Sequence, residues 1–429
     1  MTRQRQKIAV IGAGIAGLAS AYFLARRHEV TLFEAAPVLG GHANTVEIGV
    51  DGHRFPVDTG FLVLNDQTYP NLIHLFQELG VDTYATDMSF SVSADEGRLE
   101  WAGTNLDTVF AQRRRLVSPA YWNLLREILR FNRRASLNLA LCETWPLTLG
   151  ELLERDGYGA MFRRHYLLPM AAAIWSCSAA DILQFPAATF LRFCMNHGLL
   201  QIAGRPQWRT VSGGSREYVL RLAATLPDIR LCAAVTGVAR RADDGKIAVR
   251  TANHGAAEAF DSVVLATHAP QSLAMLEEAS HEEYEILSAV RYQYNRACLH
   301  TDASLMPRLR KVWSSWNYLD VATADGTDAV CVSYWLNRLQ QLPCTTPVMV
   351  TLNPAREPHP DSVLARFDYE HPVLDQAAIT AQASLATIQG KRGIWFAGAW
   401  TGYGFHEDGL KSALLIAQRF GCAPSWAQA

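Results

Sequence analysis

Three glycines near the start of the chain have the spacing of a loop that binds phosphate. Residues 12–17 read GAGIAG, and Glu34 lies 20 residues beyond Gly14. Gly12 permits a sharp turn, Gly14 lets a pyrophosphate approach the backbone, and Gly17 lets the next helix pack closely on the preceding strand. The helix N-terminus offers free N–H groups and a partial positive charge to the phosphates. Glu34 can accept hydrogen bonds from both ribose hydroxyls, which favours a dinucleotide without a 2′-phosphate.

A second glycine-rich turn lies near the other end of the chain. A strand is expected at residues 393–397, and residues 402–409 lead into a helix expected at 409–420. The glycine pair at residues 40–41 is not part of the minimal NAD-binding unit. Two helix N-termini, one for the pyrophosphate and one for the isoalloxazine, suit FAD better than NAD because reduced flavin carries negative charge.

The apolar pattern predicts the elements that would hold these loops. Residues 7–11 and 29–34 read as strands around a helix at 18–27, which is a βαβ opening with a parallel sheet. Further elements are expected as a mostly helical stretch at 106–194, a helix at 216–226, strands at 229–235, 246–251 and 262–267, a second sheet within 288–352 and a long connection at 354–372.

These elements predict an α/β fold of two domains, which the length of 429 residues also favours. A Rossmann-like, discontinuous FAD-binding domain is expected to comprise residues 1–85, 205–270 and 385–429. An α+β substrate domain with a helical insertion is expected at 86–204 and 271–384, and residues 106–200 would be mostly helical.

The composition excludes several classes of function. The 39 Lys and Arg balance 41 Asp and Glu, whereas a nucleic-acid-binding chain needs a basic excess. The eight cysteines contain no CxxC pair, which favours a reduced cytoplasmic protein over a disulfide scaffold or a zinc ribbon. HExxH, GxSxG and clusters with metal-ligand spacing are missing, so no metal site is expected. The uncharged residues 8–25 are interrupted by the three glycines, which argues against a transmembrane helix.

The chain resembles the flavin amine oxidase superfamily, which includes amine oxidases, protoporphyrinogen oxidase and phytoene desaturase-type enzymes. The matching pieces are IGAGIAGL, GGHANT, DTGF, SGGSREYV, FDSVVLAT and FAGAWTGYGFHEDGLKSA. The resemblance implies an extended FAD whose ring lies between the domains, and a noncovalent one because no cysteine stands at the attachment position. The residues that it places near FAD are Gly12, Ala13, Gly14, Ile15, Ala16, Gly17, Glu34, Gly40, Gly41, His42, Thr45, Thr59, Gly60, Phe61, Val235, Ala266, Gly398, Ala399, Glu407, Gly409 and Leu410.

The chain departs from this family at four positions. His42 stands where the family usually has arginine, and Ala399 where it usually has an acid. Arg296 lies in the segment where amine oxidases place a lysine linked through water to flavin N5, and arginine cannot act as a tunable base. His406 replaces an aromatic residue beside the last helix. These departures argue against rapid amine oxidation.

A narrower resemblance covers nearly the whole chain. LHTD, SSWNY, YWLNRLQ, TLNP and GFHEDGL are similar to a bacterial branch that commonly accompanies cyclopropane-fatty-acyl-phospholipid synthase-like enzymes. The resemblance implies an FAD-dependent dehydrogenase or desaturase that acts on an unsaturated or methyl-branched fatty acyl chain, free or phospholipid-bound, by hydride transfer to flavin N5. One alternative is an amine oxidase for a small amine or a polyamine. Another is a noncatalytic, flavin-carrying partner subunit of a lipid-modifying enzyme.

The expected catalytic residues are His406, Glu407, Arg296 and Tyr294. The expected substrate-lining residues are Trp316, Asn317, Tyr334 and His406. Histidine titrates near neutrality and suits an acid or base, whereas acids before a helix can also simply cap it. Aromatic packing inside a sheet is the alternative for the lining residues.

One segment, residues 111–140, is strongly basic. It holds seven arginines and one acid, Glu127, interleaved with apolar residues. A basic amphipathic helix can lie on anionic lipid headgroups, while a solvated helix face or a protein-partner surface is the alternative. We therefore expect a cytoplasmic protein that binds lipid or fatty acyl substrate, with a peripheral contact at the inner face of the membrane, or with a lipid enzyme, through this segment.

Overall fold

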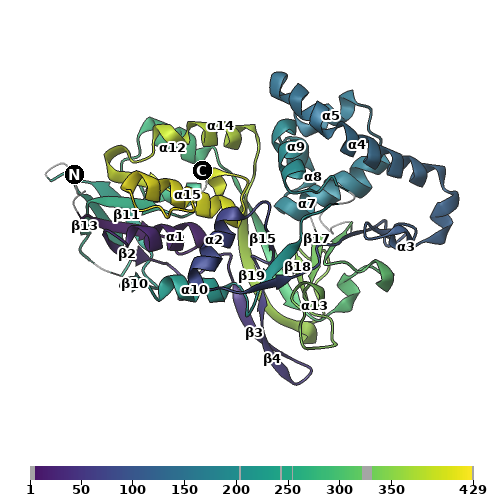
Figure 1. Cartoon of the computed structure of the whole chain (residues 1–429), viewed down its shortest axis with the longest axis horizontal. Coiled ribbons are helices and arrows are strands. Elements are labelled where there is room, and N and C mark those ends of the chain that lie inside the picture. The colour runs from purple at the N-terminus through teal and green to yellow at the C-terminus, as the bar shows by residue number, and fades with distance from the viewer. Residues whose placement is uncertain (1–4, 202–203, 242–243, 254, 321–330, 428–429) are drawn as a thin grey trace.

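A computed structural model describes residues 5–201, 204–241, 244–253, 255–320 and 331–427. One half of the molecule is built on a five-stranded parallel sheet (Figure 1). Its strands, in spatial order, are β10 (Asp228–Arg230), β2 (Glu29–Phe33), β1 (Lys7–Ile11), β14 (Ser262–Leu265) and β20 (Ile394–Phe396). The sheet therefore joins segments from the start, middle and end of the chain.

The parallel sheet is buried on both faces. From β1, Ile8 and Val10 enter one core, and Ala9 and Ile11 enter the other. Both faces need apolar residues, which explains why its strands read as continuous apolar runs. The first core also contains α1 (Ile15–Leu24), α2 (Pro70–Leu79), α10 (Arg216–Ala223) and α15 (His406–Phe420). The second contains β11 (Val235–Arg240), β12 (Ile247–Thr251), β13 (Glu258–Phe260), α11 (Ala269–Met275), α12 (His281–Ser288) and α14 (Gln376–Ser384).

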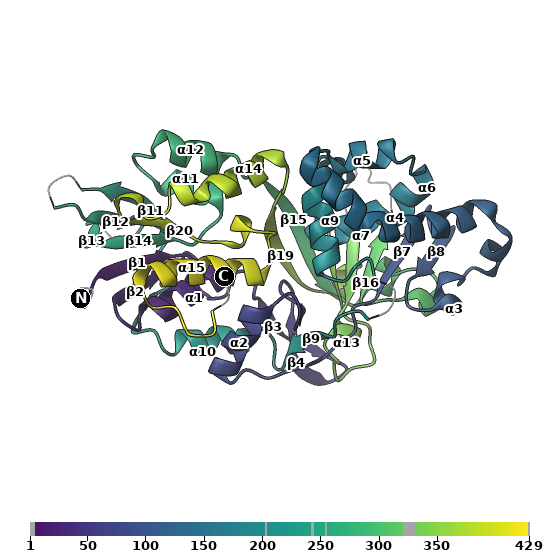
Figure 2. The same ribbon diagram turned by 45° about the horizontal axis from the view of Figure 1, so that its top comes forward.

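A seven-stranded mixed sheet forms the centre of the other half (Figure 2). Its order is β19 (Val363–Pro372), β15 (Tyr292–His300), β18 (Met349–Leu352), β17 (Cys331–Trp335), β16 (Trp316–Leu319), β7 (Phe90–Ala94) and β8 (Leu99–Ala102). All neighbours are antiparallel except β16 and β7. The predicted α/β fold with a parallel sheet is confirmed, and the expected second sheet is a mixed one.

The expected long connection at 354–372 is wrong in its second half, because β19 occupies ten residues there and pairs with β15. The four prolines favoured a loop because proline is rare in central strands. None of them interrupts β19, since Pro360 precedes the strand and Pro372 is its last residue. Proline is tolerated at such positions, where no central ladder hydrogen bond is lost.

A helical layer covers one side of the mixed sheet, within the range expected to be mostly helical. Its elements are α3 (Leu106–Val109), the 3₁₀ turn η1 (Arg113–Val117), α4 (Pro119–Thr144), α5 (Leu149–Arg155), α6 (Ala160–Phe162), the π-helical turn η2 (Arg163–Leu167), α7 (Leu168–Trp175), α8 (Ala179–Leu183) and α9 (Ala187–Asn196). The basic segment is thus not one helix. Ser118 caps α4 by accepting a hydrogen bond from the Tyr121 N–H, and Arg113, Arg114 and Arg115 precede the cap.

Besides the antiparallel sheet of β11, β12 and β13, two small sheets complete the part of the chain that the structure describes. One is the hairpin β3 (Thr45–Val50) and β4 (His53–Asp58), and the other consists of β5 (Leu64–Asn65), β9 (Trp208–Val211) and β6 (Thr83–Ala85). The short helix α13 (Leu336–Leu339) follows β17. Helix α11 crosses the domain boundary expected at residue 270, and α12 and α14 lie within the range 271–384 expected for the substrate domain, yet all three share a core with the parallel sheet.

Candidate functional site

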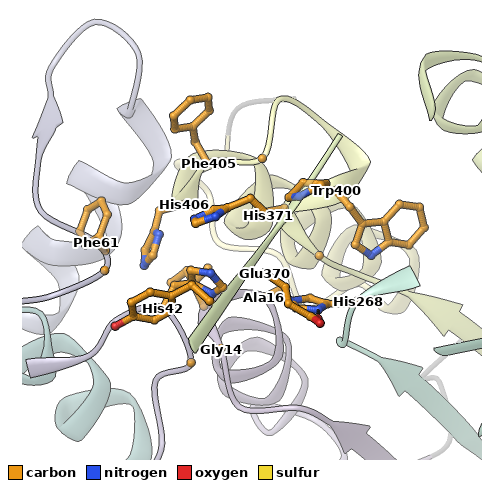
Figure 3. Close-up of a pocket in the computed structure, with 18 of the residues that line it drawn as sticks. Gly14, Ala16, His42, Phe61, His268, Glu370, His371, Trp400, Phe405 and His406 are labelled. Atoms are coloured by element: carbon orange, nitrogen blue, oxygen red, sulfur yellow. Dashed lines mark hydrogen bonds and ion pairs between the residues drawn. The ribbon is translucent and has the colours of Figure 1, made fainter. Parts of the chain in front are cut away.

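A cavity of about 680 Å³ runs from the glycine-rich loop after β1 to the mixed sheet and the helical layer. Its walls come from distant segments: the loop after β1, the glycine pair at 40–41, the end of β14, strand β19 and the loop before α15 (Figure 3). The two glycine-rich turns therefore converge on one space.

The first loop is packed so tightly that two of its glycines cannot be replaced. Gly12 has φ +98°, and a Cβ on Gly17 would lie 1.7 Å from the Gly12 carbonyl oxygen. Gly14 differs, because a Cβ built on it meets nothing within 4 Å. Gly14 is also the N-cap of α1. Open space in front of a helix N-terminus, with its free N–H groups, is a suitable place for a phosphate.

Glu34 lies where the loop and β2 meet. Its carboxylate accepts hydrogen bonds from the backbone N–H groups of Ala13 (2.7 Å) and Ala36 (2.8 Å). A carboxylate has about four lone-pair sites, so acceptors remain for the hydroxyls of a ribose. Val235 lines the same cavity at the start of β11.

His42 supplies an independent sign that the cavity takes a polar ligand. Its Nε2 is buried and has no hydrogen-bond partner among the described residues. Burial, together with the neighbouring histidines, lowers the pKa of His42 well below its usual range, so the ring is neutral. The preceding Gly41 packs against Gly14, where an added Cβ would lie 3.3 Å from the Gly14 Cα. An orphaned buried nitrogen beside the open helix end fits a bound FAD.

Most of the residues expected near FAD line this cavity, and five do not. The five are Gly17, Thr45, Glu407, Gly409 and Leu410. Thr45 donates a hydrogen bond to Asp58 Oδ1 (2.5 Å) behind the wall. Gly409 packs on α1, since a Cβ there would lie 2.9 Å from Ile15 Cγ2. These residues shape the cavity from outside.

The carboxylate of Glu407 does not face the cavity, which corrects its expected catalytic placement. Glu407 is 4% exposed and accepts hydrogen bonds from the backbone N–H of Asn71 (3.1 Å), the Asn71 side-chain amide (2.8 Å) and the backbone N–H of Leu72 (3.0 Å). Both backbone groups lie in the first turn of α2, whose N–H donors have no partner within the helix. Glu407 therefore joins α15 to the N-terminus of α2.

Glu407→Ala is expected to lower the free energy of unfolding by about 3 kcal/mol, because it leaves buried N–H donors without acceptors. Glu407→Gln, which keeps an acceptor oxygen, should lose about half as much. Urea unfolding of the two variants and the parent protein measures the difference. Equal stability of all three proteins would remove the structural role assigned to this carboxylate.

His406 does line the cavity. Its ring stacks on Phe61 with centroids 3.8 Å apart and planes inclined by 16°, and its Nε2 lies 3.0 Å from the Tyr218 hydroxyl. Burial lowers the pKa of His406 to about 3, so the imidazole is uncharged near neutral pH.

Tyr294, Arg296 and Asn317 are not in the wall of the cavity, which corrects their expected placement. Tyr294 is 57% exposed and hydrogen-bonds to Asp368, and the Arg296 side chain is 42% exposed and pairs with Glu357. The reason is the period of two along β15, which sends the neighbouring side chains of Asn295 and Ala297 inward instead. Asn317 is buried and hydrogen-bonds to Ser91 and Ser314 inside the sheet.

The end of the cavity beside the mixed sheet is apolar. Trp316 and Tyr334 line it as expected, with ring centroids 5.0 Å apart. The residues there that the sequence did not reveal are Leu62, Val63, Met88, Ala173, Ile174, Trp175, Phe193, Leu199, Trp208, Leu352 and Phe405. Three of them, Ala173, Ile174 and Trp175, lie in an uncharged stretch at residues 166–180, and no sequence pattern marks the others as lining residues. Among described residues, the carboxylates in the wall are Glu34 and Glu370, and no lysine or arginine lines it.

Comparisons with known proteins agree with this geometry. The family model described as "Flavin containing amine oxidoreductase" matches residues 15–420. The curated carotenoid phi-ring synthase of Chlorobaculum tepidum is 38% identical over 121 residues, which is 26% of this chain and 18% of that protein's length. The chain therefore spans less than a fifth of that relative.

Solved structures share the fold over almost the whole chain. The CLA-producing fatty acid isomerase from P. acnes is 17% identical with a TM-score of 0.61, covering 97% of this chain and 98% of its own. Cyclohexylamine oxidase from Brevibacterium oxydans IH-35A is 16% identical with a TM-score of 0.68, covering 97% and 100%. At these identities the likeness concerns the fold.

Proposed function

This chain belongs to the flavin-containing amine oxidoreductase family, and on that premise we propose that it is an FAD-dependent dehydrogenase or desaturase of an unsaturated or methyl-branched fatty acyl chain. The observation that carries the proposal is the apolar end of the cavity, whose wall offers aromatic and aliphatic side chains. Neither carboxylate of the described wall belongs to that end, since Glu34 lies beside the glycine-rich loop and Glu370 beside His268. An ammonium group held at the apolar end would thus lack a neighbouring counter-charge, whereas a hydrocarbon chain would bury its surface there.

The reaction removes two hydrogens from the acyl chain and leaves a carbon–carbon double bond. When bound, FAD supplies the acceptor for the hydride. We assign the accompanying proton to His406, whose ring lies in the wall on Phe61 and within 3.0 Å of the Tyr218 hydroxyl. The aromatic wall holds the C–H bond in place and keeps water out.

The charge of the wall also bears on the form of the substrate. A free fatty acid that entered head first would bury its carboxylate without a lysine or arginine in the described wall. We therefore infer that the hydrocarbon tail enters and the polar end stays outside, as it does for an acyl chain esterified to phospholipid.

Anaerobic reduction of the flavin tests the proposal. Phospholipids with monounsaturated or methyl-branched chains should bleach the flavin absorbance, whereas putrescine and benzylamine should not. Bleaching by amines alone would support the alternative of an amine oxidase. A flavin that no panel member reduces would support the noncatalytic, flavin-carrying subunit.

We also propose that the outer face of α4 contacts an anionic membrane. Trp122, Arg126, Leu129, Arg133 and Leu137 are all exposed and lie three or four residues apart, so they form one stripe along the helix. Apolar and cationic side chains alternate along it, as suits the boundary between headgroups and acyl chains.

Two further features support this contact. Seven of the fourteen large apolar side chains exposed in the described part of the chain lie between residues 106 and 145. Glu127, the single acid of the basic segment, is turned inward and accepts a hydrogen bond from the Gly159 N–H (3.1 Å).

Figure 1 shows α4 in the half of the molecule opposite the chain termini. Among the described residues no helix has the length and hydropathy to span a bilayer.

Replacing Trp122 by Ala and both Arg126 and Arg133 by Gln is expected to weaken binding to phosphatidylglycerol vesicles at least tenfold, because each surface arginine contributes about 1 kcal/mol. Vesicle flotation measures it. The control variant, with Leu220→Ala, Arg27→Gln and Arg54→Gln on other exposed positions, should bind like the parent. Equal vesicle binding by both variants would exclude a membrane contact through the stripe. If the protein bound a partner protein but no vesicles, the stripe would instead be a protein-binding surface.

A further inference from the structure

A line of polar side chains leads through the mixed sheet to the cavity wall. The backbone N–H of Arg296 donates to Asn353 Oδ1 (2.9 Å), and Asn353 Nδ2 donates to Asn295 Oδ1 (2.7 Å). Asn295 Nδ2 then lies 3.0 Å from His371 Nδ1. Asn295 is fully buried, so this line replaces apolar packing with a polar network that must be fully paired.

The direction of every hydrogen bond in this line is fixed. A backbone N–H can only donate, so Asn353 must turn its oxygen toward Arg296 and its amide nitrogen toward Asn295. Asn295 consequently presents its oxygen to Asn353 and its nitrogen to His371. The same nitrogen lies 3.2 Å from the Gln293 carbonyl oxygen, which can only accept. His371 Nδ1 must therefore be the acceptor, and the proton of the neutral ring is on Nε2.

The backbone at Asn353 is strained to hold this arrangement. Its φ is +45°, which is costly for a residue other than glycine. Its own N–H donates to the Arg296 carbonyl oxygen (2.7 Å), so Arg296 and Asn353 bind each other through two hydrogen bonds. Such strain persists where the surroundings fix it and is frequent at functional sites.

We propose that Asn353 and Asn295 are positioning residues that hold His371 as a permanently neutral donor, whose Nε2–H is directed at the bound FAD. Protonation of Nδ1 would place two donors face to face, and neither amide can turn without breaking its other bond. His371 lines the cavity, and no described group accepts a hydrogen bond from its Nε2.

The bound cofactor is the acceptor that we propose for the His371 Nε2–H. The ring of His371 lies 5.2 Å from the ring of His42, which follows the glycine pair packed on Gly14 (Figure 3). His42 thus connects His371 with the glycine-rich loop at which the dinucleotide is expected. The inference rests on FAD as the cofactor of the family, and it does not depend on the acyl substrate.

The titratable groups around His371 do not include a neighbouring negative charge that would stabilise its protonated form. His42, His268 and His406 line the same cavity, and the Glu370 carboxylate lies 3.1 Å from His268 Nδ1. Tyr369, on the same strand, hydrogen-bonds to Thr59 (2.8 Å). Burial and His268 lower the pKa of His371 to about 4. Among the described residues no group of three His, Cys, Asp or Glu side chains could hold a metal ion.

Asn295→Asp is the decisive variant, because a carboxylate still accepts from Asn353 but also accepts from His371. It should put a proton on Nδ1 and raise the pKa of His371 into the neutral range. Nitrogen-15 NMR of the histidines, with His371→Gln to identify the resonance, reads the protonated nitrogen directly. In the parent protein His371 should carry its proton on Nε2 and not titrate between pH 5.5 and 8.

Two readouts on the FAD-loaded protein complete the test. His371→Leu should weaken FAD binding about tenfold, as the loss of a hydrogen bond to a polar cofactor does. Asn295→Asp should shift the flavin midpoint potential to a more positive value below the new pKa of His371 only. Asn353→Gly keeps the backbone conformation and removes the amide, so it should free His371 to titrate.

The proposal is overturned if parental His371 titrates between pH 5.5 and 8, or if His371→Leu and Asn295→Asp leave both FAD affinity and potential unchanged. These measurements use no substrate. Failure of every acyl lipid to reduce the flavin would therefore contradict the proposed function and leave the result for His371 standing.

Discussion

Gly14→Val is expected to abolish flavin binding and to leave the flavin-free protein folded. The backbone of Gly14 has φ −72° and ψ −176°, which valine readily adopts, and a Cβ there meets nothing within 4 Å. The added methyl groups would fill the open space before α1, where the phosphates must approach its N–H groups. We expect FAD affinity to fall by roughly 100-fold or more, since a loss of about 3 kcal/mol has that effect. Flavin content and titration of the flavin-free protein with FAD measure it.

Two matched glycine variants separate the cofactor site from the fold. Gly17→Ala should fail to fold, because its Cβ would lie 1.7 Å from the Gly12 carbonyl oxygen. Gly255→Val should change nothing, because Gly255 has open space around it outside the cavity. Circular dichroism of all three variants is the common readout. A yellow, stable Gly14→Val protein would contradict the assignment of this loop to the cofactor.

The loops of the expected dinucleotide site could be located in the sequence because they depend on local backbone geometry. Gly12 needs a positive φ, and Gly17 needs close packing on the turn four or five residues earlier, so both requirements are visible in a short sequence. Glu34 is found by its distance along one βαβ unit. Both features lie within 30 residues and need no knowledge of the rest of the fold.

The direction of single side chains could not be predicted in the same way. Arg296 and Tyr294 alternate with Asn295 along β15, and a shift of one residue in the assumed register exchanges the inward and outward sets. Glu407 lies one residue from His406, yet it turns to the N-terminus of α2, more than 300 residues away in sequence. Its role depends on a contact that only the folded chain reveals.

The apolar end of the cavity depends on long-range packing as well. Trp175 and Phe193 come from the helical layer, while Trp316 and Tyr334 come from the mixed sheet. Apolar residues in a helix or sheet look the same in sequence whether they pack on each other or line a space for a ligand. The sequence could therefore show that the chain is rich in aromatics but could not show which of them form the wall.

The stability of the protein is expected to fall when the pH drops from 6.5 to about 4. The fold protects buried histidines from protonation, because burial lowers the pKa of His197, His300 and His371 to about 4 and that of His406 to about 3. Burial also lowers the pKa of His42, His165 and His268. Histidine in an unfolded chain titrates near pH 6.5, so in this window the unfolded chain binds more protons. Their contribution is complete above pH 6.5 and is lost as the pH falls toward 4.

Three buried acids act in the opposite direction. Burial raises the pKa of Asp58 and Asp408 to about 6 and also raises that of Glu407, so the folded chain binds their protons first and gains stability as the pH falls. The histidines are more numerous and their pKa values lie further from the unfolded value, so a net loss should remain. We expect the free energy of unfolding to decrease by at least about 3 kcal/mol between pH 7 and 4.5. Urea titrations followed by tryptophan fluorescence measure this difference.

His300 allows the cause to be isolated. It is fully buried, its Nδ1 accepts a hydrogen bond from the Asp302 N–H (3.1 Å), and its Nε2 lies 2.7 Å from the Thr351 hydroxyl. His300→Gln keeps a donor toward Thr351 but has no titrating group, so its loss of stability between pH 7 and 4.5 should be smaller by about 2 kcal/mol. His281→Gln, at an exposed position, should behave like the parent. If His300→Gln instead lost as much stability as the parent between pH 7 and 4.5, protonation of this buried ring would not be what weakens the fold in acid.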